Sequence, residues 1–94
     1  MVIVSLTYKR PLAEVDKHGP AHVAWLGRCY DAGMLIASGR KVPRVGGVII
    51  AKGTMSAVKA LCEGDPFYIH GVADHEFMEV EVVFTAMGLE ALRC

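Results

Sequence analysis

The sequence predicts an α+β fold with the element order βαββαβ, and three observations lead to this prediction. Apolar and polar residues alternate at the start and near the end of the chain, as in strands with two unlike faces. Two intervening segments carry apolar residues at helical spacing instead. Between these helical segments lie two short apolar, β-branched runs, which are typical of strands.

The first strand is predicted over residues 2–8, VIVSLTY. One face carries Val2, Val4, Leu6 and Tyr8, and the other carries Ile3, Ser5 and Thr7. Residues 34–40 and 46–53 predict two further strands. The basic, proline-containing loop 41–45 is expected to join them as a hairpin. Its neighbouring Gly46-Gly47 pair is not a phosphate loop, because it lacks the strand-to-helix context and the lysine of such motifs.

A helical stripe follows the first strand. Its members, at spacings of three, four and seven residues, are Val15, His22, Leu26, Cys29 and Gly33. Gly19-Pro20 interrupts the segment, and proline cannot donate the backbone hydrogen bond of a helix interior. We therefore expect either a kink or a fresh start, with the main helix over residues 20–32 and Gly33 as its C-terminal cap.

A second helix is predicted after the hairpin. Thr54 or Ser56 is a candidate N-cap. The residues expected to face inward are Val58, Leu61 and Cys62. Asp65-Pro66 is expected to end this helix, because proline disfavours helical geometry in the residue before it.

The last strand is predicted over residues 75–87, where Glu79 and Glu81 alternate with Met78, Val80 and Val82, so one face is wet. This order is that of a ferredoxin-like fold, with both helices on one face of a four-stranded antiparallel sheet. The other face has no cover. We expect two subunits to pack these faces together, so the chain is predicted to be a single domain, residues 1–94, that forms a homodimer.

Composition excludes several classes of function. Ten basic and ten acidic residues leave no net charge to hold a nucleic acid or an anionic membrane surface. The apolar runs are far shorter than the roughly 20 residues that span a bilayer. No secretion signal is expected at Met1, and the protein is predicted to be cytoplasmic.

The number and spacing of the cysteines bear on disulfide bonds and zinc binding. Cys29, Cys62 and Cys94 are odd in number and lack CxxC spacing, which argues against disulfides and a structural zinc site. They are expected to be reduced thiols, two of them in the core.

Two polar residues have competing interpretations. His22 lies among apolar neighbours on the helical stripe, where a histidine is most often a core residue bonded to one backbone carbonyl. Asp65 precedes a proline, as residues that end helices commonly do. A functional interpretation of either depends on the other, because a carboxylate that contacts an imidazole can fix its tautomer and stabilise its charged form.

The chain resembles the YciI-like family of small bacterial proteins over essentially its whole length. The resemblance is carried by PAHVAWLGRCYDAGMLIASGR, by GGVIIA and by the second helix, which is expected to end in DPF. It implies a dimeric α+β barrel and a catalytic pair, His22 and Asp65, in a pocket. Many relatives have Gly-Pro where this chain has Gly39-Arg40, so substrate preference is not carried past this loop.

Further residues are candidates for binding a small molecule. Ser38 is either a pocket hydroxyl or a small residue needed for close packing. Arg40, with Lys41 and Arg44, either attracts an anionic or phenolate substrate or keeps the hairpin loop soluble. The aromatic residues that either line a pocket or pack in the core or dimer interface are Tyr8, Trp25, Phe67 and Tyr68. Of these, Phe67 belongs to the DPF motif and is taken as a substrate-binding candidate.

The remaining histidines are weaker candidates. His18 and His22 have the spacing of a helical metal pair, but Gly19-Pro20 is expected to break the register and no third ligand is evident. His70 and His75 fall in a loop and at a strand start, where solvated histidines are ordinary. We therefore expect neither a metal nor an organic cofactor.

Two functions fit these residues. The first is a small-molecule enzyme that uses His22 and Asp65 for acid/base chemistry without a cofactor. The family resemblance implies a concrete reaction, the elimination of HCl from a chlorinated hydroxyhydroquinone in aromatic degradation. The second is a non-catalytic ligand-binding or accessory module, in which His22 and Asp65 only position a ligand or hold the helices.

Overall fold

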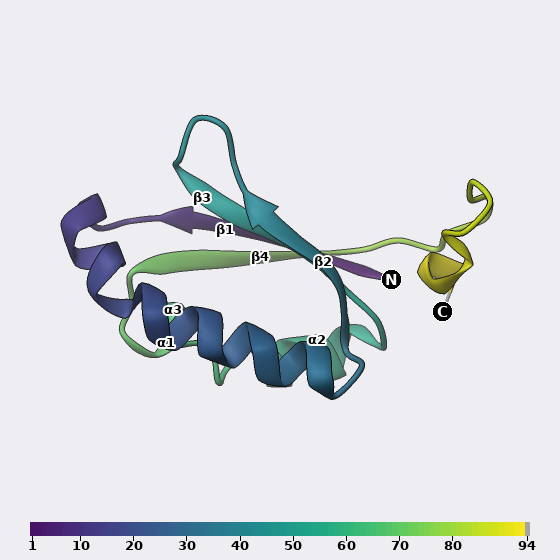
Figure 1. Cartoon of the computed structure of the whole chain (residues 1–94), viewed down its shortest axis with the longest axis horizontal. Coiled ribbons are helices and arrows are strands. Elements are labelled where there is room, and N and C mark those ends of the chain that lie inside the picture. Colours follow the sequence, from purple (N-terminus) through teal and green to yellow (C-terminus); the bar gives the residue numbers. More distant parts are fainter. Residues whose placement is uncertain (94) are drawn as a thin grey trace.

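The computed structural model describes residues 1–93 as a four-stranded antiparallel sheet with its helices on one face (Figure 1). The elements are β1 (Val2–Tyr8), α1 (Leu12–Asp31), β2 (Leu35–Arg40), β3 (Gly46–Ala51), α2 (Met55–Cys62), α3 (Pro66–Ile69), β4 (Ala73–Glu79) and the 3-10 helix η1 (Glu90–Arg93). The strand order is β2-β3-β1-β4. The predicted α+β class and the order βαββαβ are confirmed.

The alternation in β1 places one side of the sheet on the core. Val2, Val4 and Leu6 are buried beneath the helices, and they pair with β3 on one side and β4 on the other. The buried apolar residues of the core are Val2, Val4, Leu6, Val15, Trp25, Cys29, Leu35, Ile49, Ala51, Val58, Cys62, Phe67, Val72 and Ala73. They lie between the sheet and α1 to α3, so the helix-facing side of the sheet carries the core.

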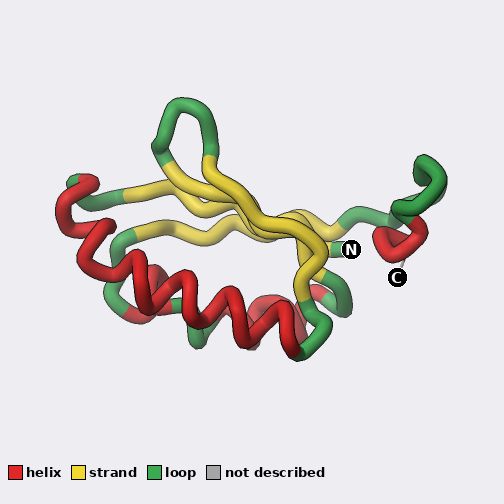
Figure 2. Tube along the Cα trace, viewed as in Figure 1, coloured by secondary structure: helices red, strands yellow, loops and turns green. Residues whose placement is uncertain are grey.

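Helix α1 corrects the prediction that the main helix covers residues 20–32, because it runs without a break from Leu12 to Asp31 with Pro20 inside it (Figure 2). Val15 before the proline and Trp25 after it are both buried, so core packing on both sides favours one helix over a fresh start. At the other end, the predicted cap is confirmed. Gly33 has a positive φ of 74°, its N–H donates to the Tyr30 carbonyl, and Met34 N donates to the Cys29 carbonyl.

Helix α2 begins as predicted, with the Thr54 hydroxyl accepting from the Ala57 N–H at 3.2 Å. Its inward residues Val58 and Cys62 are buried, and Leu61 is half-buried. The predicted end at Asp65-Pro66 is wrong, because α2 already ends at Cys62. Asp65 instead caps the short helix α3, where the proline occupies the first turn and needs no N–H partner.

The prediction of a last strand over residues 75–87 is also wrong at both ends. Strand β4 begins at Ala73 and stops at Glu79, and the next residue, Val80, still donates its N–H to the Met1 carbonyl at 2.8 Å. The pairing ends there because β1, the neighbouring strand, begins at Val2. The residues that follow run away from the sheet toward η1 (Figure 1).

The two thiols predicted to lie in the core, Cys29 and Cys62, are buried. Cys94 lies outside the described residues. Over residues 1–93, no helix has both the length and the apolar character needed to cross a membrane.

Candidate active site

The side chain of Asp65 is completely buried and both of its oxygens are hydrogen-bonded. Oδ1 accepts from His22 Nδ1 at 2.7 Å and from the Phe67 N–H at 3.0 Å. Oδ2 accepts from His75 Nε2 at 2.8 Å. Helices α1 and α3 and strand β4 therefore meet at one carboxylate, which we call the His–Asp–His cluster (His22, Asp65 and His75).

The carboxylate of this cluster is held in its charged form. Burial by itself would raise the pKa of Asp65, but the hydrogen bonds from His22 and His75, the charge of His22 and the Phe67 N–H together lower the pKa below its usual value. An ionised carboxylate only accepts hydrogen bonds. Each imidazole therefore donates an N–H to Asp65.

The ring of His22 is fixed by stacking as well as by Asp65. It lies parallel to the Phe67 ring, with centroids 4.0 Å apart and 7° between the planes. Its side chain is 14% exposed. Because Nδ1 is bonded to Asp65, Nε2 is the ring nitrogen available to a bound molecule, and it makes no hydrogen bond within residues 1–93.

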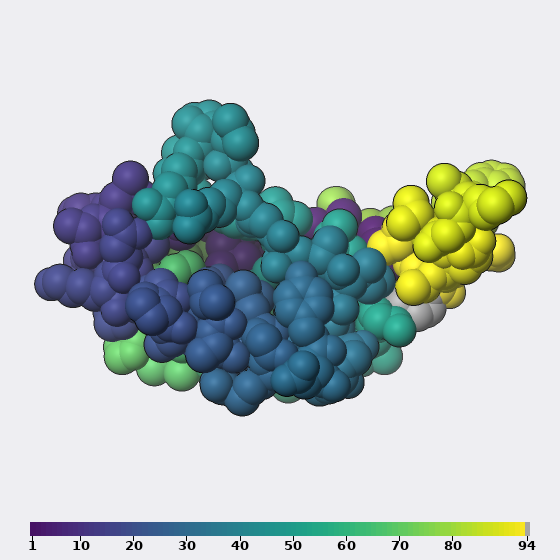
Figure 3. Space-filling view, viewed as in Figure 1, coloured from purple at the N-terminus to yellow at the C-terminus, as the bar shows by residue number. Residues whose placement is uncertain are grey.

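A pocket of about 680 Å³ lies beside His22. Its walls come from α1, β1, the β2–β3 hairpin and α3, and Figure 3 shows the surface hollowed between α1 and the hairpin. The predicted substrate-binding residues Ser38, Arg40 and Phe67 all line it. Asp65 and His75 do not line the pocket, so they lie behind the His22 ring rather than at its surface.

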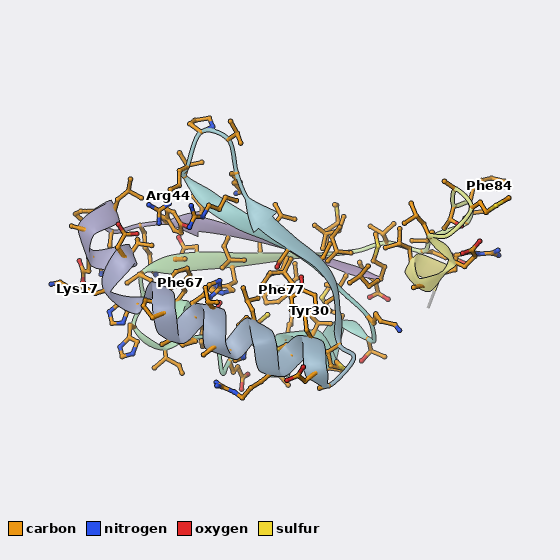
Figure 4. The ribbon with its side chains drawn as sticks, viewed as in Figure 1. Lys17, Tyr30, Arg44, Phe67, Phe77 and Phe84 are labelled. Carbon is orange, nitrogen blue, oxygen red and sulfur yellow. The ribbon has the colours of Figure 1, made fainter. Side chains whose placement is uncertain are left out.

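Two arginines of the β2–β3 hairpin, Arg40 and Arg44, line the pocket. Arg44, across from Phe67 in Figure 4, pairs with Asp16, which also lines the pocket, at 2.6 Å. Its guanidinium also lies 6.0 Å from the centroid of the Tyr8 ring. Arg40 forms no ion pair in the described part of the chain. The pocket thus offers an aromatic wall beside His22, and across from it the Arg44–Asp16 ion pair and the guanidinium of Arg40.

The comparisons with known proteins identify the family. A family model described as the YCII-related domain matches residues 1–81. The chain belongs to the YCII-related family. No curated protein sequence matches it.

One solved structure similar to this YCII-related chain is 5-chloro-2-hydroxyhydroquinone dehydrochlorinase (TftG) from Burkholderia phenoliruptrix AC1100, in complex with 2,5-dihydroxybenzoquinone. The TM-score is 0.65 and the sequence identity 18%, over 85% of this chain and 93% of that one. At this identity the likeness shows the shared fold.

The other sequence candidates occupy different places in this YCII-related chain. Ser38 lines the pocket, where its hydroxyl is hydrogen-bonded to the Tyr30 hydroxyl at 2.8 Å. Tyr8 also lines the pocket, whereas Trp25 packs in the core and Tyr68 lies edge-on to His75. Lys41 donates to the Thr7 hydroxyl and is absent from the pocket wall.

The interpretation of His75 as a solvated residue is wrong, because its side chain is only 2% exposed. It pairs with Leu6 across β1 and β4, which places it on the helix-facing side of the sheet. The sequence contains a signal for this. Phe77, two residues later, is half-buried on the same face, and period-two alternation from Phe77 brings His75 inward.

The buried thiols of Cys29 and Cys62 are poor candidates for thiolate chemistry. Burial, with smaller contributions from Asp65 and Cys29, raises the pKa of Cys62 to about 12, and burial also raises the pKa of Cys29. Both thiols therefore stay protonated. Within residues 1–93, no three or more His, Cys, Asp or Glu side chains are placed so that they could hold a metal ion, and His22, Asp65 and His75 hydrogen-bond one another instead. His18 stacks on His70 instead, with ring centroids 4.1 Å apart.

Proposed function

We propose that this protein is a cofactor-independent acid/base enzyme in which His22 removes a proton from a small aromatic substrate. The observation that carries the proposal is the 2.7 Å contact between His22 Nδ1 and the buried Asp65 carboxylate at the wall of a pocket. Asp65 fixes the tautomer with Nδ1 protonated and stabilises the imidazolium that forms during proton transfer. Asp65 is a positioning residue, since it does not reach the pocket.

The pocket favours a planar substrate with an ionisable hydroxyl. The Phe67 ring, which stacks on His22, supplies an aromatic wall, and Arg40, which forms no ion pair in the described chain, supplies positive charge for a phenolate. Ser38 places a hydroxyl on the same surface. The volume of about 680 Å³ falls within the usual range for small-molecule sites, about 300–1,000 Å³.

The most concrete reaction is elimination of HCl from a chlorinated hydroxyhydroquinone. In the keto tautomer, the ring carbon that bears chlorine has already taken up a proton. His22 Nε2 takes a proton from a remaining ring hydroxyl, the O–H electron pair forms the quinone carbonyl, the adjoining ring double bond shifts, the C–Cl bond breaks, and its electron pair leaves with chloride. The product is a hydroxyquinone, so the step needs no outside oxidant. The name of the structural neighbour and its bound quinone support this substrate class.

The second candidate is a binding or accessory module that holds a small aromatic molecule without converting it. The stacked His22 and Phe67 rings favour it, because they form an aromatic platform that does not depend on proton transfer. The two functions differ in whether a product forms.

The test is chloride release, with the ultraviolet-visible spectrum of the quinone, from chlorinated and unchlorinated hydroxyhydroquinones. We expect the wild type to release chloride and form a quinone, and His22→Asn to lose about a hundredfold or more of this rate. If no compound yields chloride or quinone but some raise the melting temperature, the enzyme proposal is wrong and the binding module takes its place.

A further inference from the structure

We propose that His75 is a positioning residue of this site: it holds Asp65 in the orientation that His22 needs and remains neutral, so the exchangeable proton of the cluster resides on His22. The inference rests on the proposed function, because it assigns His75 a role in the same proton transfer. His75 lies on β4, away from the pocket, and belongs neither to the pocket wall nor to the motifs that carry the family resemblance.

Hydrogen bonds to both oxygens fix the orientation of the Asp65 carboxylate. A buried carboxylate oxygen without a donor is costly, and Asp65 is completely buried. The Phe67 N–H and His22 satisfy only Oδ1, so His75 Nε2 is the donor within the described chain that satisfies Oδ2. With donors on both oxygens, the plane of the carboxylate cannot turn away from His22.

The hydrogen bonding of His75 favours its neutral form. Its Nε2 donates to Asp65, while its Nδ1 is buried and has no hydrogen-bond partner in the described structure. A charged imidazolium would carry a proton on Nδ1 as well, which would leave a buried N–H without an acceptor. The Tyr68 ring lies beside His75 at 87° to it, with centroids 5.7 Å apart, and offers no hydrogen bond to Nδ1. These surroundings favour the neutral ring with its proton on Nε2.

His22 differs from His75 in that its ring reaches the pocket. The ring of His22 lines the pocket and is partly exposed, so a proton on Nε2 can be hydrated or exchanged with a substrate. The other titratable groups that interact with Asp65 are the Cys29 and Cys62 thiols, and burial keeps both protonated. The cluster therefore combines one negative carboxylate, one neutral imidazole and one imidazole that gains and loses a proton.

The test compares two substitutions of His75. His75→Phe keeps a planar ring but removes the donor, whereas His75→Gln retains an N–H that reaches toward Asp65. The matched control is His70→Phe, which changes an exposed histidine at the end of α3 that does not contact Asp65. We expect His75→Phe to lower kcat about tenfold or more with little change in KM, as loss of an orienting partner does. His75→Gln and His70→Phe should remain close to the wild type.

A second measurement needs no turnover. In nitrogen-15 spectra of the histidine rings at about pH 7, His75 should show the neutral ring with its proton on Nε2, because its buried Nδ1 has no acceptor in the described structure. The low-field signal of the His22 Nδ1 proton should weaken in His75→Phe and persist in His75→Gln. A doubly protonated His75, or a His75→Phe variant with unchanged His22 signals and kcat, would overturn the inference.

These two measurements separate the inference from the proposed function. If no substrate is converted, the enzyme proposal fails, but the ring spectra still decide the state of His75. If His75→Phe does not fold, the wild-type spectra and the kcat of His75→Gln decide it instead. A His75→Gln variant that loses as much activity as a His22 variant would contradict a role that only requires a donor.

Discussion

The two faces of the sheet differ in how completely a single chain covers their side chains and pairs their polar groups. On the helix-facing side, Asp65 is fully buried and both of its oxygens have donors. On the open side, Ile50, Ile3 and Met78 form a row across three neighbouring strands with no helix above them. Met78 is 56% exposed.

The apolar side chains in the segment after β4 are even more exposed than those on the open face. Phe84 and Met87, in the segment that leaves the sheet after β4, are 91% and 97% exposed (Figure 4). A single chain can therefore assemble the His–Asp–His cluster by itself, but it leaves apolar surface that a second copy would cover.

The largest expected effect follows from Asp65→Asn on the covered face. The change leaves the buried His75 and the partly exposed His22 facing a neutral amide, so we expect the free energy of unfolding to fall by about 3 kcal/mol, as measured in urea. The matched control is Asp74→Asn, which breaks the exposed Lys9–Asp74 pair and should cost about 0–1 kcal/mol. Equal losses in the two variants would mean that the buried cluster adds no special stability.

The open face is tested by the oligomeric state. We propose a homodimer that buries the row of Ile50, Ile3 and Met78, so the wild type should sediment as two chains at micromolar concentration. Met78→Lys should raise the dissociation constant about a hundredfold, because a charge would enter an apolar interface. Ile69→Lys, a change of similar exposure on α3, should leave the dimer intact. A wild type that sediments as one chain removes the homodimer.

The smallest expected effect is a change of stability with pH. The pKa of Asp65 is lower in the folded chain than in the unfolded one, so its contribution is fully present above the unfolded value of about 4. This contribution is lost as the pH falls through the folded pKa. The stability difference between the wild type and Asp65→Asn should therefore narrow below about pH 4 in urea titrations. A difference that stays constant down to about pH 2 would contradict the lowered pKa.

Local patterns in the sequence predicted the elements well where neighbouring residues decide them. The alternation of β1, the Thr54 cap and the Gly33 turn depend on residues a few positions apart, and all three are confirmed. Pro20 was misjudged because Val15 and Trp25 pack on both sides of it, and sequence spacing does not measure that packing.

Non-local pairing explains the other errors. Residues 80–87 alternate like a strand, but β4 stops where the neighbouring β1 begins, and only the sheet register reveals this limit. The contact between His22 and Asp65 was implied by family resemblance, since 43 residues separate them. His75 was missed because the strand was read from Met78 and Val80 inward, whereas Phe77 marks the covered face.

The role of His22 as the base is measured by chloride release from a chlorinated hydroxyhydroquinone in two variants, His22→Asn and His18→Asn. His18 lies one turn earlier on α1 and stacks on His70 rather than contacting Asp65. We predict that His22→Asn, still folded, loses about a hundredfold or more of the rate while His18→Asn keeps it. Equal rates in the two variants would contradict the account.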